Sequence, residues 1–124
     1  MCRSWHLNTI DVPWYLIGHT IQARNLMAIT NSENLFLQYD LYHCGMNGEN
    51  LEDSIKSNLN VIDYIQVAGV LGRAEPDIGD IDFKKSLKFG YRGWVGGVYT
   101  LQTHTLEGMK WASVYGIGSP FQTV

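Results

Sequence analysis

The chain has 124 residues, 45% of them hydrophobic and 17% charged, which suffices for one modest globular core. Nine Lys and Arg against twelve Asp and Glu give a net charge of -3, and this scattered charge argues against a nucleic-acid surface. No apolar stretch approaches the roughly 20 residues of a membrane span, and the first residues lack the apolar segment of a signal peptide. We expect one cytoplasmic domain over residues 1–124.

Two cysteines, Cys2 and Cys44, lie far apart in the sequence. Their spacing matches no Cys-x-x-Cys motif of zinc or redox chemistry, so they are interpreted as two unrelated free thiols.

The first half of the chain predicts a helix, a strand and a second helix. Thr20 is placed to cap the first helix, which has an apolar side. The apolar run 35–39 follows a polar turn and has the length of a buried strand. The second helix is indicated by four apolar residues at spacings of four, four and three, which are Leu51, Ile55, Leu59 and Ile62.

The second half predicts two more strands and two short helices. The apolar run 64–68 reads as a strand, and it is closed by a loop over 69–80. Phe83 and Leu87 indicate a short helical piece before a strand over 94–99, which its glycines weaken. A last helix is expected around Leu106, Met109 and Val114. Apolar strands separated by helices predict an α/β fold with a parallel sheet and outer helices.

Chemistry in such sheets is found at the carboxyl ends of the strands, which singles out a few polar residues. Asp40 ends the first predicted strand and His43 follows it, so the two could form a metal and substrate pair, or Asp40 could simply cap a loop. Gln66 lies inside an apolar run, where its amide could ligate a hard cation or bond to neighbouring backbone.

A loop over 72–76 follows the same strand as Gln66 and carries two charged residues. Arg73 could reach over the strand end and bind the carboxylate or alkoxide of a small substrate. Alternatively, Arg73 and Glu75 form a surface ion pair, which contributes little stability.

Three segments in order, 37–43 (LQYDLYH), 65–76 (IQVAGVLGRAEP) and 90–96 (GYRGWVG), resemble the hydroxypyruvate isomerase family. The resemblance runs from about residue 8 to residue 111, whereas the tail over 113–124 matches no known pattern. It implies roughly the C-terminal half of a xylose-isomerase-like (β/α)₈ TIM barrel and the interconversion of hydroxypyruvate and tartronate semialdehyde through an enediol. The implied substrate is a small hydroxy-oxo acid.

The resemblance also implies roles for individual residues. By position, Asp40 and Gln66 match ligands of a divalent metal, Mg²⁺ or Mn²⁺, while His43 and Arg73 match residues that contact substrate. The two family glutamates, which ligate metal and move protons, fall at Trp5 and Val98. His6 neighbours the first of these positions, but adjacent strand residues point to opposite faces, so it is not expected to compensate.

These departures predict a hydroxypyruvate isomerase homologue that is truncated and inactive as an isolated chain. Loss of one positioned acid or base typically costs about 10² to 10⁴ in rate, and here two are replaced. A complete barrel takes about 250 residues, so a half barrel would expose strand edges and an apolar face. The alternative is a non-catalytic binding or assembly subunit that completes its barrel with a second copy or a partner chain. Barrel nucleases that act on abasic DNA are disfavoured by the charge of -3 and the four histidines.

Overall fold

The computed structural model describes residues 1–70, 72–102 and 106–114. Its strands are β1 (Cys2–Trp5), β2 (Leu35–Asp40), β3 (Ile62–Val67) and β4 (Trp94–Gly97). Its helices are α1 (Thr20–Thr30), α2 (Leu41–Met46), α3 (Leu51–Asn58), α4 (Phe83–Leu87), the 3₁₀ turn η1 (Leu106–Met109) and α5 (Lys110–Val114). Most of the tail over 113–124, for which the sequence made no prediction, lies outside the described residues.

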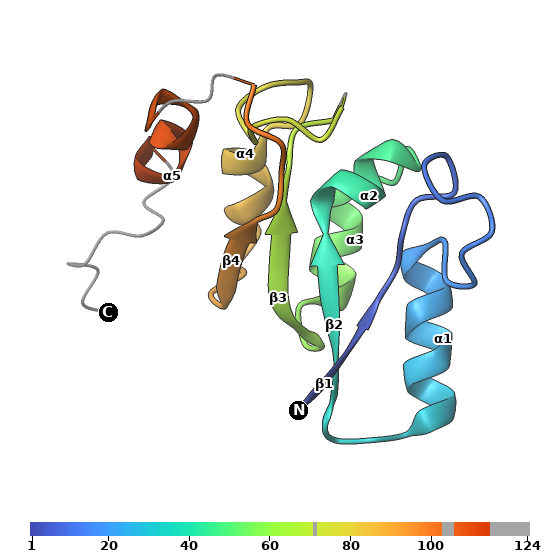
Figure 1. Cartoon of the computed structure of the whole chain (residues 1–124). Coiled ribbons are helices and arrows are strands. Elements are labelled where there is room, and N and C mark those ends of the chain that lie inside the picture. The colour runs from blue at the N-terminus through green and yellow to red at the C-terminus, as the bar shows by residue number, and fades with distance from the viewer. Residues whose placement is uncertain (71, 103–105, 115–124) are drawn as a thin grey trace.

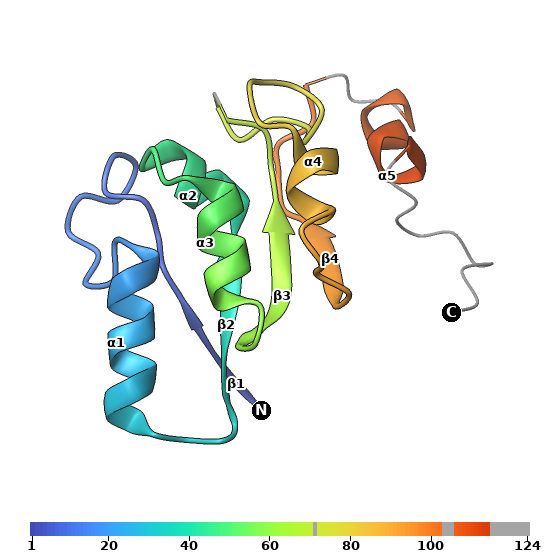
Figure 2. The ribbon, with the colours of Figure 1, turned by 180° about the vertical axis from the view of Figure 1, so that it is seen from behind.

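The four strands pair in chain order, β1-β2-β3-β4, and every pair is parallel. Helices α1, α3 and α4 lie on one face of this sheet, as Figure 2 shows, whereas none of the helices in the described part of the chain covers the opposite face in Figure 1. Sequential parallel strands with their helices on one side are the winding of a (β/α) barrel, since a doubly wound sheet covers both faces. The expected α/β class with a parallel sheet and outer helices is confirmed.

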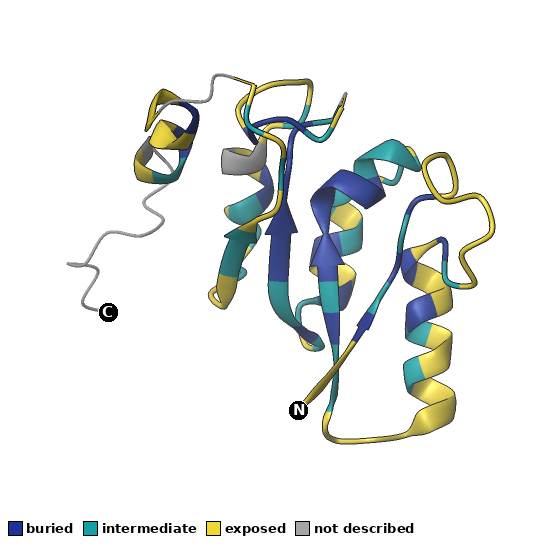
Figure 3. Ribbon diagram, in the orientation of Figure 1, coloured by how far each residue is buried: buried dark blue, intermediate teal, exposed yellow. Residues whose placement is uncertain are grey.

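Side chains alternate between the two faces of the sheet. Leu37, Tyr39, Ile65 and Val67 are fully buried under the helices. Their neighbours on the other face, such as Gln38, are only half-buried, and the alternation of buried and intermediate segments is visible along β2 in Figure 3. The core therefore lies between the sheet and its helices, as a period of two in each strand requires.

Helix α3 is shorter than the apolar spacing predicted. Asn50 caps its first turn by accepting a hydrogen bond from the backbone N–H of Asp53, and the helix ends at Asn58. Ile62 is not a helical residue but the first residue of β3, where it pairs with Leu37. The prediction of Ile62 on the helical face was wrong, because one apolar spacing continued across a turn into a strand.

Three other local expectations are corrected. The N-cap of α1 is His19, and Thr20 is its first helical residue. Strands β3 and β4 both end earlier than predicted, at Val67 and Gly97. The sequence assigned no explicit bounds to β1 and missed α2, since segments of four to six residues carry little periodicity.

The remaining elements agree with the predicted order. The run 35–39 lies in β2, Phe83 and Leu87 bound α4, and a last helical segment includes η1 and α5. Among the described residues, no helix has the length and apolar character needed to cross a membrane.

Candidate functional site

The carboxyl ends of the four strands bring together the residues that the sequence singled out. Asp40 is the last residue of β2 and pairs in register with Gln66 of β3, which pairs with Gly96 of β4. Trp5 ends β1, and Val98 directly follows β4. Residues 26 or more positions apart in the sequence thereby share one end of the sheet, as parallel pairing dictates.

Asp40 is the centre of this strand-end site. Its Oδ1 accepts hydrogen bonds from the backbone N–H groups of Tyr42 at 3.0 Å and His43 at 3.4 Å, so it caps α2. Its Oδ2 accepts from Gln66 Nε2 at 2.8 Å and from Arg73 Nη2 at 3.4 Å. Asp40 therefore caps α2, as the loop-capping alternative predicted, and it also bonds to Gln66 and Arg73.

Burial raises the pKa of Asp40 to about 6, because a carboxylate loses its hydration there. The Arg73 guanidinium opposes this rise most strongly, followed by the two backbone N–H groups and the indole of Trp5. The Trp5 Nε1 has no partner at hydrogen-bond distance among the described residues, so its effect on Asp40 is the weaker, longer-range one. These neighbours therefore offset only part of the rise in the pKa of Asp40 that burial causes.

His43 is held from its other side by Asn8. Its Nδ1 lies 3.1 Å from the backbone N of Asn8, which donates to it, and 2.7 Å from Asn8 Nδ2. Burial, with help from the Arg73 charge, lowers the pKa of His43 to about 4, so the ring is neutral at pH 7. Since Nδ1 accepts, the ring proton is on Nε2, which lies 3.6 Å from Asp40 Oδ2.

Arg73 reaches the site from the loop after β3. Its backbone is in the left-handed region (φ 54°), and its Nε donates to the carbonyl of Val98 at 3.0 Å. The loop is tight, because a Cβ on Gly69 would lie 2.2 Å from the carbonyl oxygen of Ile78. The guanidinium stacks over the Tyr42 ring and keeps 28% of its side chain exposed, so it is fixed but open to a ligand.

Arg73 and Glu75 do not form the surface ion pair that was suggested as an alternative, because each has a different partner. Arg73 instead pairs with the buried Asp40, and its Nη1 lies 3.4 Å from His43 Nε2. Glu75 is buried and accepts a hydrogen bond from the backbone N–H of Gln102 at 2.8 Å, which ties the loop to the segment after β4.

Gln66 forms a chain of side-chain amides. Its Oε1 accepts from Gln38 Nε2 at 3.0 Å, while its Nε2 donates to Asp40. The alternative of an amide bonded to neighbouring backbone is thus replaced by bonding to two side chains. A divalent cation fits this donor set poorly, because the set holds a single carboxylate, Asp40, with the Arg73 cation beside it. The role of Asp40 and Gln66 as metal ligands stays a prediction from resemblance.

Neither position assigned to a family glutamate holds an acid or a base. The ring of Trp5 packs edge-on against His43 with centroids 5.9 Å apart, and Val98 is half-exposed after β4. His6 turns to the opposite face, where its Nε2 lies 3.2 Å from Cys44 Sγ. As expected from strand alternation, His6 does not replace the carboxylate at position 5.

Two residues near the site were not assigned a role from the sequence. Asp11 accepts hydrogen bonds from Asn8 Nδ2 at 2.9 Å and from the Tyr42 hydroxyl at 2.6 Å, and these bonds lower the pKa of Asp11. Asn8 Oδ1 also accepts from the backbone N–H of Asp11 at 2.7 Å. The Asn-x-x-Asp spacing is a signal for such an Asx turn, but it does not indicate the contact with His43.

Comparison with proteins of known sequence gives consistent relatives, although no profile of a known protein family matches the chain. The chain is 30% identical over 113 residues to a 2-oxo-tetronate isomerase of Cupriavidus necator and 34% identical over 114 residues to the hydroxypyruvate isomerase of Escherichia coli. Each alignment covers 88% of this chain and 44% of the relative. The chain therefore spans less than half the length of the curated relatives it matches.

Solved structures support the same placement. A Brucella melitensis protein described as an AP endonuclease of family 2 superposes with a TM-score of 0.83 at 33% identity, over 91% of this chain and 45% of its own. An L-ribulose 3-epimerase superposes with a TM-score of 0.66 at 18% identity, over 98% of this chain and 41% of its own, which shows the shared fold alone. Over the segment that they share, the chain is a homologue of the hydroxypyruvate isomerases.

Proposed function

We propose that the strand-end site binds the carboxylate of a small hydroxy-oxo acid of the hydroxypyruvate type without isomerising it. The observation that carries this proposal is the fixed, partly exposed guanidinium of Arg73 beside a neutral His43, at a strand end where Trp5 and Val98 supply no carboxylate. Homologous hydroxypyruvate isomerases support the ligand class.

Binding follows from the donors at the site. The N–H groups of the Arg73 guanidinium that are not bonded to Val98 or Asp40 can donate to a carboxylate, and the guanidinium is held in place by the Val98 carbonyl and the Tyr42 ring. His43 Nε2–H is next to it and suits a hydroxyl or carbonyl oxygen of the same ligand. A small acid would thus replace solvent on Arg73 while Asp40 stays paired with Gln66.

Isomerisation needs more than binding, since a proton must leave one carbon and return to its neighbour through a positioned base and acid. Trp5 and Val98 cannot exchange protons in this way. Asp40 is fully buried and its two oxygens accept four hydrogen bonds, so it is not free to take a proton from substrate. We therefore expect no turnover by this chain, with or without Mg²⁺ or Mn²⁺.

The test combines binding and turnover on the 124-residue chain. Calorimetric titration with hydroxypyruvate is expected to give binding that Arg73→Gln abolishes and that the exposed control Arg92→Gln retains. Formation of tartronate semialdehyde, followed in the presence of Mn²⁺, is expected to stay at the background rate. Turnover that Asp40→Ala abolishes would overturn the inactive assignment, and equal binding by Arg73→Gln would overturn the ligand site.

The proposal extends to a partner for the sheet and to the location of the protein. The uncovered face of the sheet would be covered by further polypeptide, either a second copy or a partner chain, since parallel sheets are ordinarily buried on both faces. Light scattering on the purified chain tests this, because a monomer with a cooperative thermal transition argues against it. A cytoplasmic location, without nucleic-acid or membrane partners, completes the proposal.

A further inference from the structure

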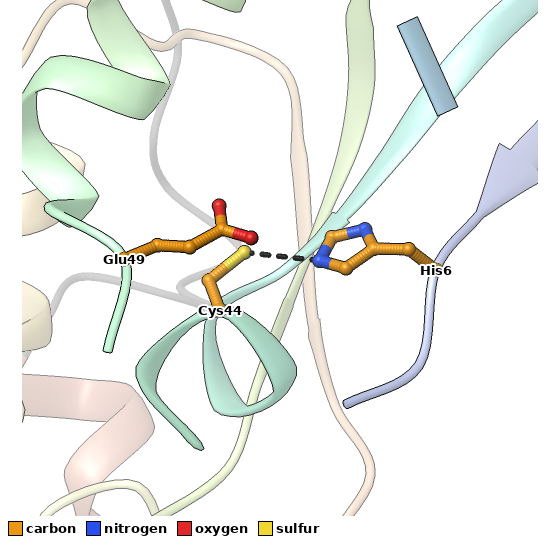
Figure 4. A group of neighbouring side chains, drawn as sticks. All are labelled: His6, Cys44 and Glu49. Carbon is orange, nitrogen blue, oxygen red and sulfur yellow. Dashed lines mark hydrogen bonds between the residues drawn. The ribbon is translucent and has the colours of Figure 1, made fainter. Parts of the chain in front are cut away.

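A second group of polar side chains lies away from the strand-end site. His6 follows β1, Cys44 belongs to α2, and Glu49 lies in the connection from α2 to α3 (Figure 4). One ligand atom from each of them, a ring nitrogen, the Sγ and a carboxylate oxygen, lies within 4.8 Å of the others. His6 Nε2 and Cys44 Sγ are 3.2 Å apart and face one another in Figure 4.

We propose that His6, Cys44 and Glu49 form a binding site for a divalent transition metal of the Zn²⁺ type. Imidazole nitrogen, thiolate sulfur and carboxylate oxygen are the three ligand kinds that proteins use for zinc. Thiolate and imidazole together disfavour Mg²⁺ and Ca²⁺, which prefer oxygen ligands only. Three protein ligands leave a fourth position for water, as in an open zinc site.

The ligands are held before any metal binds. His6 and Cys44 are completely buried, so their side chains have little freedom to lose. Thr20 donates its hydroxyl to Glu49 Oε2 at 2.7 Å and its backbone N–H to Oε1 at 3.3 Å, which orients the carboxylate. Such outer contacts around ligating groups are a regular feature of metal sites.

The orientation of the His6 ring suits a metal ligand. Its Nδ1 is buried without a hydrogen-bond partner among the described residues, while Nε2 faces the sulfur. In the tautomer with its proton on Nδ1, the ring directs the Nε2 lone pair at the site. The Cys44 proton leaves to solvent when the thiolate binds the metal.

A cleft borders the group on the side of Glu49. An open cleft of about 480 Å³ is lined by residues of α1 and α3 together with Glu49. His19 and Arg24 also line this cleft, and His19 Nδ1 lies 3.7 Å from Glu49 Oε1. Glu49 is therefore the member of the group that borders the cleft, whereas His6 and Cys44 are completely buried. Arg24 is the one cation among the lining residues and opposes the metal weakly across an open cleft.

The site is separate from the one that resemblance predicted. Trp5 faces His43 at the strand ends, whereas His6, the next residue, faces Cys44 on the helix side. The two cysteines also differ, because Cys2 is exposed in β1 and Cys44 is buried in the core. Cys2 consequently provides a matched control thiol.

Titration of the full chain with Co²⁺ tests the site, because thiolate ligation gives a sulfur-to-cobalt charge-transfer band in the near ultraviolet. We expect one equivalent of Co²⁺ to produce this band in the wild type and in Cys2→Ser, and Zn²⁺ to displace it. Cys44→Ser should abolish the band, and Glu49→Gln should weaken Co²⁺ binding by about tenfold or more while the fold persists by circular dichroism.

Three results would overturn the proposal. The first is the absence of a charge-transfer band in folded wild-type protein. The second is a band that survives in Cys44→Ser or disappears in Cys2→Ser. The third is unchanged Co²⁺ affinity in folded Glu49→Gln, which keeps the test decisive if Cys44→Ser fails to fold, since the Glu49 side chain is only partly buried.

Discussion

Replacing Asp40 by Asn tests how the strand-end site carries its charge. Asn keeps an oxygen for the backbone N–H groups of Tyr42 and His43, so α2 retains its cap. The amide of Gln66 can turn over to accept from the new Asn N–H, and the amide of Gln38 can turn over to accept from Gln66, which preserves the chain of hydrogen bonds. What the variant loses is the buried negative charge and its pairing with Arg73.

The magnitude follows from the pKa of Asp40, which is 3.8 ordinarily and about 6 in the folded chain. Between these values the folded state binds more protons than the unfolded state, so the free energy of unfolding falls as pH rises. The difference corresponds to about 3 kcal/mol, present below pH 4 and lost as pH rises through 6. Asp40→Asn removes this loss.

The titration of His43 changes the free energy of unfolding in the opposite direction over nearly the same pH range. Its pKa falls from 6.5 to about 4, so its contribution is present above pH 6.5 and is lost as pH falls through 4. The two contributions largely offset one another in the wild type. In Asp40→Asn only the His43 contribution remains, and the stability of the variant should rise with pH between 4 and 6.5.

Urea denaturation monitored by tryptophan fluorescence at several pH values between 4 and 7.5 measures the free energy of unfolding of the wild type and of Asp40→Asn. The stability of Asp40→Asn relative to the wild type should increase by up to about 3 kcal/mol from pH 4 to pH 7. The control Glu33→Gln, at an exposed carboxylate before β2, should change stability by less than about 0.5 kcal/mol throughout. A relative stability of Asp40→Asn that is constant or falls with pH would refute the reasoning, since it would mean that Arg73 outweighs burial.

Three further predictions concern packing, backbone and hydrogen bonding. Leu37→Ala should lower the free energy of unfolding by about 2 to 5 kcal/mol because Leu37 is fully buried, whereas Leu16→Ala at an exposed position should change it little; urea denaturation decides. Asn31→Gly should preserve or raise the melting temperature and Asn31→Ala lower it, because this C-cap has φ 47°. Tyr42→Phe removes the hydroxyl bond to Asp11 and should raise the pKa of Asp11 in an NMR titration; an unchanged pKa would contradict the bond.

The strand-end site was predictable in part. Asp40, His43 and Arg73 follow strands that are apolar enough to recognise, and parallel pairing then places such residues at one edge. Their partners were not predictable, because the contact of His43 with Asn8 spans 35 residues and depends on how the segment after β1 returns across α2. The left-handed backbone of Arg73 has no signature in a non-glycine residue, so its stacking on Tyr42 was equally hidden.

The sequence by itself determined the α/β class and the order of most of the strands and helices, because apolar runs and their spacing are local features of the chain. Only the tertiary structure decided the register that sets Asp40 beside Gln66 and the approach of His6 to Cys44 over 38 residues. Cys2 and Cys44 are both free thiols, as the sequence predicted, whereas the proximity of Cys44 to His6 and Glu49 is set by packing. Contacts between distant segments depend on strand register and loop closure, and no local pattern of residues encodes these.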